Sequence, residues 1–183
     1  MDILNRKFVT PVYTVFLFIL LLASGTMISH ANYQASQKQK VIAGAIYKFI
    51  KFVEWETEAS KSQASFNVCL LQHDAAFEPF KQRKIQGKAI NIVLVDGHEN
   101  ADACHVLYLN LAETDSKKIL QSLTNKSVLT ISEQAGFAAQ GGIVELGNTN
   151  NRLTFSINLL AAKAQSLNIG FQLLSLAKKV IES

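Results

Sequence analysis

Hydrophobic residues between positions 37 and 55 recur every three or four residues, a spacing typical of one face of an α-helix. This spacing predicts a single amphipathic helix that begins near Gln37 and ends at Trp55. Lysines occupy much of its opposite face. Trp55 either covers the edge of the core or lies exposed as an anchor for a partner. The apolar face comprises Val41, Ile42, Ala45, Ile46, Phe49, Ile50 and Val53.

Four later segments have the composition of β-strands. The second of them, 90–95, consists almost entirely of β-branched residues and leucine, which predicts a strand buried on both faces. Two helices are predicted between the strands, one over 75–82 with Asp74 as its N-cap and one from Thr114 or Asp115 to about 123. This alternation of strands and helices is typical of an α/β fold. The four predicted strands are 66–71, 90–95, 105–109 and 127–131.

A β-hairpin is predicted near the C-terminus. Its first strand is Ile143–Leu146, and residues 147–151 contain Gly and Asn, which favour a turn because they tolerate left-handed backbone. Apolar and polar residues then alternate from Leu153 to Ile157, the period of a half-buried return strand.

Three polar residues of this hairpin are predicted to be structural. Asn158 can cap a helix that begins at Leu159. Arg152 is expected to pair with Glu145 across the hairpin.

The helical C-terminus is predicted to break near 167–170, where Asn and Gly disfavour helix, and to resume over 173–181.

The N-terminus has the features of a secretory signal peptide. Arg6 and Lys7 supply positive charge, a run of twelve mostly apolar residues follows over 12–23, and the Ser29-His30-Ala31 sequence ends in small residues. We therefore expect cleavage after Ala31, which divides the chain into a signal peptide, 1–31, and a mature domain, 32–183. An uncleaved membrane anchor is the alternative, but about twenty apolar residues are needed to span a bilayer.

The mature segment has the length and charge of one ordinary globular domain. Its 152 residues include 16 basic and 13 acidic side chains, a net charge of +3. A chain of this length buries roughly two thirds of its unfolded surface and needs no metal to fold. No run of lysine and arginine is interleaved with aromatic residues, so nucleic acid is not a predicted partner.

Three segments contain candidate chemical groups, but none has the spacing that the chemistry requires. The glycine pair Gly141-Gly142 precedes a strand and lacks the Lys-Ser/Thr of a phosphate loop. The basic segment 81–88 indicates a solvated loop, with an anion contact as the alternative. An acidic and histidine-containing segment matches no zinc or calcium motif, so we expect a surface turn and no metal or cofactor. Its members are Asp96, His98, Glu99, Asp102 and His105.

Two cysteines remain in the mature domain. Cys69 lies within the first predicted strand, and Cys104 borders another strand that could neighbour it. Since the chain is predicted to be exported to an oxidising compartment, we expect a Cys69–Cys104 disulfide. Its closure of 35 residues would stabilise the fold by about 3.8 kcal/mol in the loop-entropy treatment. Two buried thiols are the alternative.

Five sequence blocks, in order and at fitting separations, resemble the YfiR family of periplasmic regulatory proteins. The resemblance covers 41–180. Glu56 departs from it, because a proline commonly follows the tryptophan, and a second cysteine pair found in some members is absent. The blocks are Ile46–Trp55, Cys69, Cys104–Tyr108, Phe137–Ile143 and Arg152–Asn158, the last followed by a leucine-rich tail.

The resemblance implies a single α/β domain, often dimeric, with a central mixed β-sheet flanked by helices and a C-terminal hairpin followed by helices. It also implies a periplasmic repressor that binds the periplasmic domain of an inner-membrane diguanylate cyclase of the YfiN type. Less cyclic di-GMP is then made, and biofilm formation falls. On this interpretation the protein is not an enzyme, and Phe52, Trp55 and Arg152 are candidate partner-binding residues. The alternative is a periplasmic small-ligand-binding protein or enzyme with a pocket near Arg152.

Overall fold

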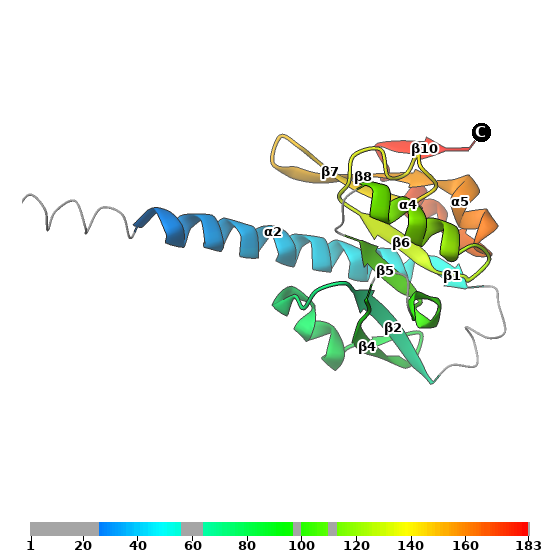
Figure 1. Ribbon diagram of the computed structural model, residues 1–183, viewed down its shortest axis with the longest axis horizontal. Helices are drawn as coiled ribbons and strands as arrows, with labels where there is room; N and C mark the ends of the chain where they lie inside the picture. The colour runs from blue at the N-terminus through cyan, green and yellow to red at the C-terminus, as the bar shows by residue number, and fades with distance from the viewer. Residues whose placement is uncertain (1–25, 56–63, 97–99, 110–112, 183) are drawn as a thin grey trace, which may run out of the picture. The chain divides into compact units, whose positions relative to one another are not determined.

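The computed structural model describes residues 26–55, 64–96, 100–109 and 113–182 (Figure 1). The chain divides into two compact units, Met1–Gln39 and Lys40–Ser183. Helix α2 (Thr26–Lys51) begins in the first unit and ends in the second. None of the helices in the described ranges combines the length and hydropathy needed to cross a bilayer. Most of the predicted signal peptide, residues 1–25, lies outside the described residues.

An eight-stranded mixed β-sheet forms the centre of the second unit (Figure 1). Its strands lie in the order β10-β8-β7-β6-β5-β2-β4-β3. Neighbours are parallel except for the pairs β7–β8 and β3–β4. The strands are β2 (Ser65–Leu70), β3 (Lys84–Ile85), β4 (Lys88–Leu94), β5 (Val106–Leu109), β6 (Leu129–Ser132), β7 (Val144–Thr149), β8 (Arg152–Asn158) and β10 (Lys179–Ile181).

Helices cover both faces of the sheet, which confirms the predicted fold class. On one face, Val68 and Leu70 of β2 pack in a large core with apolar residues of α2, η1 and α5. On the other face, Cys69 packs with Ile119 and Leu123, from α4 and the turn after it. The remaining elements are η1 (Ala75–Gln82), η2 (Ala101–Ala103), α4 (Glu113–Ser122), α5 (Leu159–Ala164), α6 (Phe171–Leu174), and β1 (Val53–Trp55) paired with β9 (Leu167–Ile169).

The first predicted helix ends four residues earlier than expected. Helix α2 stops at Lys51, and the next residues form β1, antiparallel to β9. Strand pairing overrides the helical spacing here because it buries Val53 and Trp55 on the same side while Glu54 stays exposed. The indole N–H of Trp55 donates to the Ser127 carbonyl at 2.9 Å, which fixes the end of β1.

Two further predictions were wrong. Strand β4 is not buried on both faces, since Ile90 is its one buried residue. This strand lies near the edge of the sheet, where only the two-residue strand β3 follows it. The last predicted helix, 173–181, is instead the end of α6 followed by β10, which pairs in parallel with the second half of β8. Lys178 donates its N–H to the Phe155 carbonyl at 2.8 Å, which brings this segment to the edge of the sheet.

The predicted hairpin is present, with a shorter turn. Strand β7 continues to Thr149, which pairs with Arg152. Asn150 and Asn151 form the turn between them, and both have positive φ, 51° and 59°. A two-residue turn with positive φ at both positions suits the twist of a hairpin, which explains the two consecutive asparagines.

Candidate functional site

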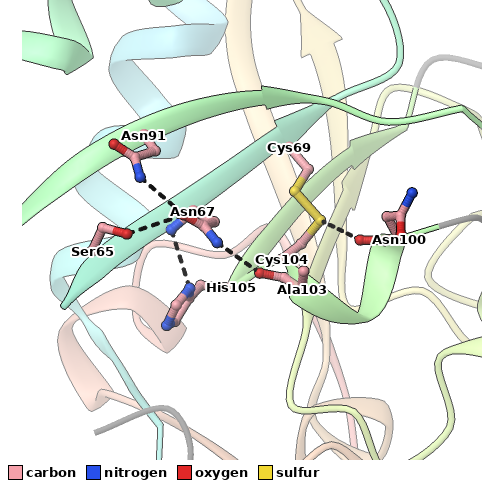
Figure 2. The surroundings of a disulfide bond; sticks show 8 residues. All are labelled: Ser65, Asn67, Cys69, Asn91, Asn100, Ala103, Cys104 and His105. Carbon is pink, nitrogen blue, oxygen red and sulfur yellow. Dashed lines mark hydrogen bonds between the residues drawn. A yellow bond between two sulfur atoms is a disulfide. The ribbon is translucent and has the colours of Figure 1, made fainter. Parts of the chain in front are cut away.

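The predicted disulfide between Cys69 and Cys104 is present (Figure 2). Cys69 lies in β2, and Cys104 lies two residues before the neighbouring strand β5. Their Cα atoms are 5.8 Å apart. Both residues are buried. The bond therefore joins two segments that are 35 residues apart in the sequence, within the core between the sheet and α4.

Asn67 organises the polar contacts beside the disulfide (Figure 2). Its side-chain amide donates to the Ala103 carbonyl at 2.9 Å, and its oxygen accepts from Ser65 and from Asn91 at 3.4 Å each. Its main-chain N–H donates to Nδ1 of His105 at 3.1 Å. These contacts hold the loop that carries Cys104 against β2.

His105 is a core residue in this arrangement. Its ring stacks on Phe66 with 4.4 Å between centroids, and its Nδ1 already accepts a main-chain hydrogen bond. The described residues contain no group of three or more potential metal ligands. His98 and Glu99, two members of the segment considered for metal binding, lie outside the described residues.

Asn158 and Glu145 both bind the peptide groups of Ala138. Asn158 donates from Nδ2 to the Ala138 carbonyl at 2.7 Å, and Glu145 accepts the Ala138 N–H at 3.1 Å. Asn158 also caps α5, because its oxygen accepts the Ala161 N–H at 2.9 Å. Together these two side chains attach the 137–142 loop to the hairpin.

The ion pair expected between Arg152 and Glu145 is not formed. Register places Arg152 opposite Thr149 and Glu145 opposite Ser156, at different ends of the hairpin. Within the described part of the chain, Arg152 has no carboxylate partner and its side chain is exposed. Glu145 instead accepts the N–H of Ala138 in the 137–142 loop. The expectation failed because β7 extends to Thr149, which changes the register between the two strands of the hairpin.

The glycine pair serves packing. Gly142 lies directly against the ring of Phe137, where an added Cβ would overlap the ring atoms. Its N–H donates to the Phe137 carbonyl at 2.9 Å. Gly141 has a φ of 101°, which favours glycine. The pair is therefore explained by a tight loop around a buried aromatic ring.

The basic segment after η1 is partly engaged within the chain. Lys81 contacts Glu78 at 2.9 Å, and His73 lies 3.4 Å from the same carboxylate. The hydrogen bond from Lys81 is the main reason that the pKa of Glu78 is lowered. Arg83 lies over the ring of Tyr47 at 4.6 Å from the centroid.

An open apolar groove lies between α2, β8 and α6, and we call it the α2–β8 groove. Its volume is about 430 Å³. The rings of Phe49 and Phe155, 4.8 Å apart, bring α2 and β8 together. The groove is lined by Lys40, Val41, Gly44, Ala45, Lys48, Phe49, Phe52, Leu153, Phe155, Leu173 and Leu176.

Several large side chains of this groove are unusually exposed. Val41 is 56% exposed, Phe52 37% and Leu176 71%. Gly44 is also exposed, within the interior of α2, and a Cβ at this position would meet no atom within 4 Å. Glycine destabilises a helix interior by about 1 kcal/mol relative to alanine. Packing within the described residues does not explain this glycine.

The three predicted partner-binding residues occupy different environments. Phe52 lines the groove, and Arg152 lies exposed on β8 next to the groove residue Leu153. Trp55 is 7% exposed and belongs to the core. Binding by these residues stays a prediction. Sequence reasoning placed Val41 in the core stripe and passed over Gly44, although a glycine within a strong helical pattern is a visible signal.

Comparison with known proteins agrees with this fold. A Vibrio cholerae O1 biovar El Tor structure described as a conserved domain protein superimposes with a TM-score of 0.51 at 10% identity, covering 76% of this chain and 60% of that one. An ABC domain in complex with L-Trp from Streptococcus pneumoniae gives a TM-score of 0.43 at 9% identity, with coverages of 64% and 55%. The chain thus spans less than two thirds of either structure, and the first likeness supports the fold alone.

Sequence comparison is more specific. No curated protein matches the chain significantly. Residues 39–178, well over half of the chain, match the family described as YfiR/HmsC-like. This range contains both cysteines, the hairpin and every residue that lines the α2–β8 groove. The chain therefore belongs to the YfiR/HmsC-like family.

Proposed function

We propose that this protein is a non-catalytic periplasmic regulator that binds an inner-membrane diguanylate cyclase of the YfiN type and holds it inactive. The observation that carries the proposal is the family match over residues 39–178. Binding would lower cyclic di-GMP and, with it, biofilm formation. The active form would be the mature segment after Ala31, as a monomer or a homodimer.

Two features of the structure support this proposal. The buried disulfide fits a protein that works in an oxidising compartment, where such bonds persist. The exposed apolar side chains of the α2–β8 groove offer a surface that a protein partner can cover. Contiguous exposed apolar surface of this kind marks interaction sites on soluble domains.

Gene deletion tests the proposed function. Cyclic di-GMP, measured by mass spectrometry, should rise in the deletion strain and return to its original level when the full-length gene is restored. The rise should disappear when the partner cyclase is also deleted. An unchanged cyclic di-GMP level in the single deletion, with the cyclase expressed, would refute the repressor function.

Two substitutions connect this effect to the surface. Phe52→Glu places a charge in the lining of the groove. When the gene for this variant is introduced into the deletion strain, it should lower cyclic di-GMP only part of the way to the original level. Lys118→Glu changes an exposed residue of α4, on the opposite face of the sheet from α2, and should restore it fully. Both variants should melt within a few degrees of the parent, because both positions are exposed. Arg152→Ala tests whether the hairpin contributes to the same contact.

A second candidate function is the binding of a small ligand. The groove volume of about 430 Å³ falls in the range of about 300–1,000 Å³ for ligand sites, and its lining residue Leu153 follows Arg152 in β8. This function predicts that a low-molecular-weight periplasmic extract raises the melting temperature of the purified protein. A melting temperature that does not respond, together with a cyclic di-GMP effect in the deletion strain, selects the repressor function.

A further inference from the structure

The arrangement of residues along α2 indicates what kind of segment fits the α2–β8 groove. Lys40, Gly44 and Lys48 are spaced by four residues, so they form one row on the surface of the helix. Gly44 interrupts this row, since no atom lies within 4 Å of the place where its Cβ would be. Side-chain rows of one helix pack into the gaps of another, and a gap of this kind admits a second helix at short interaxial distance.

Exposed apolar side chains line the groove that contains this gap. Val41 is 56% exposed on α2, and Leu176, after α6, is 71% exposed. Phe52 at the end of the helix is 37% exposed. A helix that lies in the groove would contact them through residues one turn apart, the pattern by which amphipathic helices bind grooves.

The charges around the groove indicate the polar face of that helix. The groove contains two lysines and no acidic residue, and α2 contains no acidic residue along its whole length. Neither Lys40 nor Lys48 has a carboxylate partner in the described part of the chain. A second copy that presented its own α2 would bring lysines against lysines, which disfavours this occupant.

We propose that the α2–β8 groove binds an amphipathic helix of a protein partner, with apolar residues over Gly44 and acidic residues opposite Lys40 and Lys48. The inference rests on the proposed function only in that it takes the partner to be a protein. It adds the docking surface, the secondary structure of the bound segment and the sign of its charge. The lysines would then gain the carboxylate partners that α2 itself does not supply.

Site-specific photo-cross-linking tests the docking surface in the cells that produce the protein. The full-length chain carries p-benzoyl-phenylalanine at Val41 or, as the control, at Lys118 of α4. Cross-linked products are isolated, and the attached peptide is identified by mass spectrometry. We expect a product at Val41 and none at Lys118, with the attached peptide from a helix that has Asp or Glu on both sides of its apolar stripe.

The possible products separate this inference from the proposed function. An acidic amphipathic helix of a diguanylate cyclase at Val41 supports both, and the same kind of helix from another protein at Val41 supports the groove but refutes the cyclase as partner. A cyclase captured at Lys118 alone refutes the groove and leaves the proposed function standing. A second copy at Val41, a segment without acidic borders, or no product at either position refutes the groove.

Substitutions in the groove give a quantitative test with the partner domain identified by cross-linking. Gly44→Leu should weaken binding at least tenfold, because the new side chain occupies the gap, while Gly44→Ala should weaken it less. Lys48→Glu should also weaken binding at least tenfold, whereas Lys118→Glu should leave it unchanged. The two Gly44 variants should melt at or above the parent temperature, since each adds a helix-favouring residue. Parent-like binding by Gly44→Leu would refute the proposal.

Discussion

The contacts of Asn158 lead to a stability prediction in which two components can be separated. One side-chain atom, Oδ1, accepts the Ala161 N–H as the cap of α5. The other, Nδ2, donates to the buried Ala138 carbonyl at 2.7 Å. Asn158→Ala removes both hydrogen bonds at once, whereas the sequence indicated the cap alone.

The expected magnitude follows from these two bonds. Loss of an N-cap lowers the free energy of unfolding by about 1 kcal/mol. Ala138 is 1% exposed, and its carbonyl would keep only a long 3.4 Å contact with the Gly141 N–H. A buried carbonyl without a good partner costs about 1–3 kcal/mol. Asn158→Ala should therefore destabilise the domain by about 2–4 kcal/mol, which lowers its melting temperature by roughly 5–15 °C at this chain length.

Urea unfolding with the disulfide intact measures this effect. Trp55 is the only tryptophan and is buried, so its fluorescence reports the loss of the core. Asn158→Ser is the matched variant, because its hydroxyl can still cap α5 but cannot replace the amide donor to Ala138. Asn158→Ser should therefore lower the free energy of unfolding by only about 1–3 kcal/mol. The reasoning fails if Asn158→Ala lies within about 0.5 kcal/mol of the parent, the usual scatter of neutral surface changes.

Three further predictions concern the core. Mass spectrometry of alkylated, unreduced protein should detect no free thiol, and labelled cysteines in freshly isolated protein would contradict the disulfide. Replacing Cys69 and Cys104 by alanine should lower the free energy of unfolding by about 2–5 kcal/mol. Gly142→Ala should cost about 1–3 kcal/mol because the new methyl group overlaps the ring of Phe137, and an unchanged urea midpoint would count against that packing. Trp55→Phe should cost about 1–3 kcal/mol, measured by circular dichroism, since a buried main-chain carbonyl loses its indole donor; a variant as stable as the parent would show that this hydrogen bond is dispensable.

Local patterns in the sequence were sufficient for much of the fold. The spacing of apolar residues located the C-terminal part of α2, β2, β5 and the hairpin, because helix and strand periods depend on neighbouring residues alone. The cap at Asp74 was equally readable, and it accepts the Ala76 N–H at 2.9 Å. The cysteine pair was predictable from its count and from the expected compartment. These signals need no knowledge of which segments meet in space.

Only the tertiary structure decided the features that join distant segments. Strand β1 exists because β9, more than 110 residues later, pairs with it, and β10 exists because β8 offers an open edge. The same helical pattern that predicted Val41 as core contains part of the groove wall, where Val41 stays 56% exposed. The spacing of apolar residues shows only that one face of the helix is apolar. Which part of that face is buried depends on non-local packing, and here that packing left the candidate docking surface open.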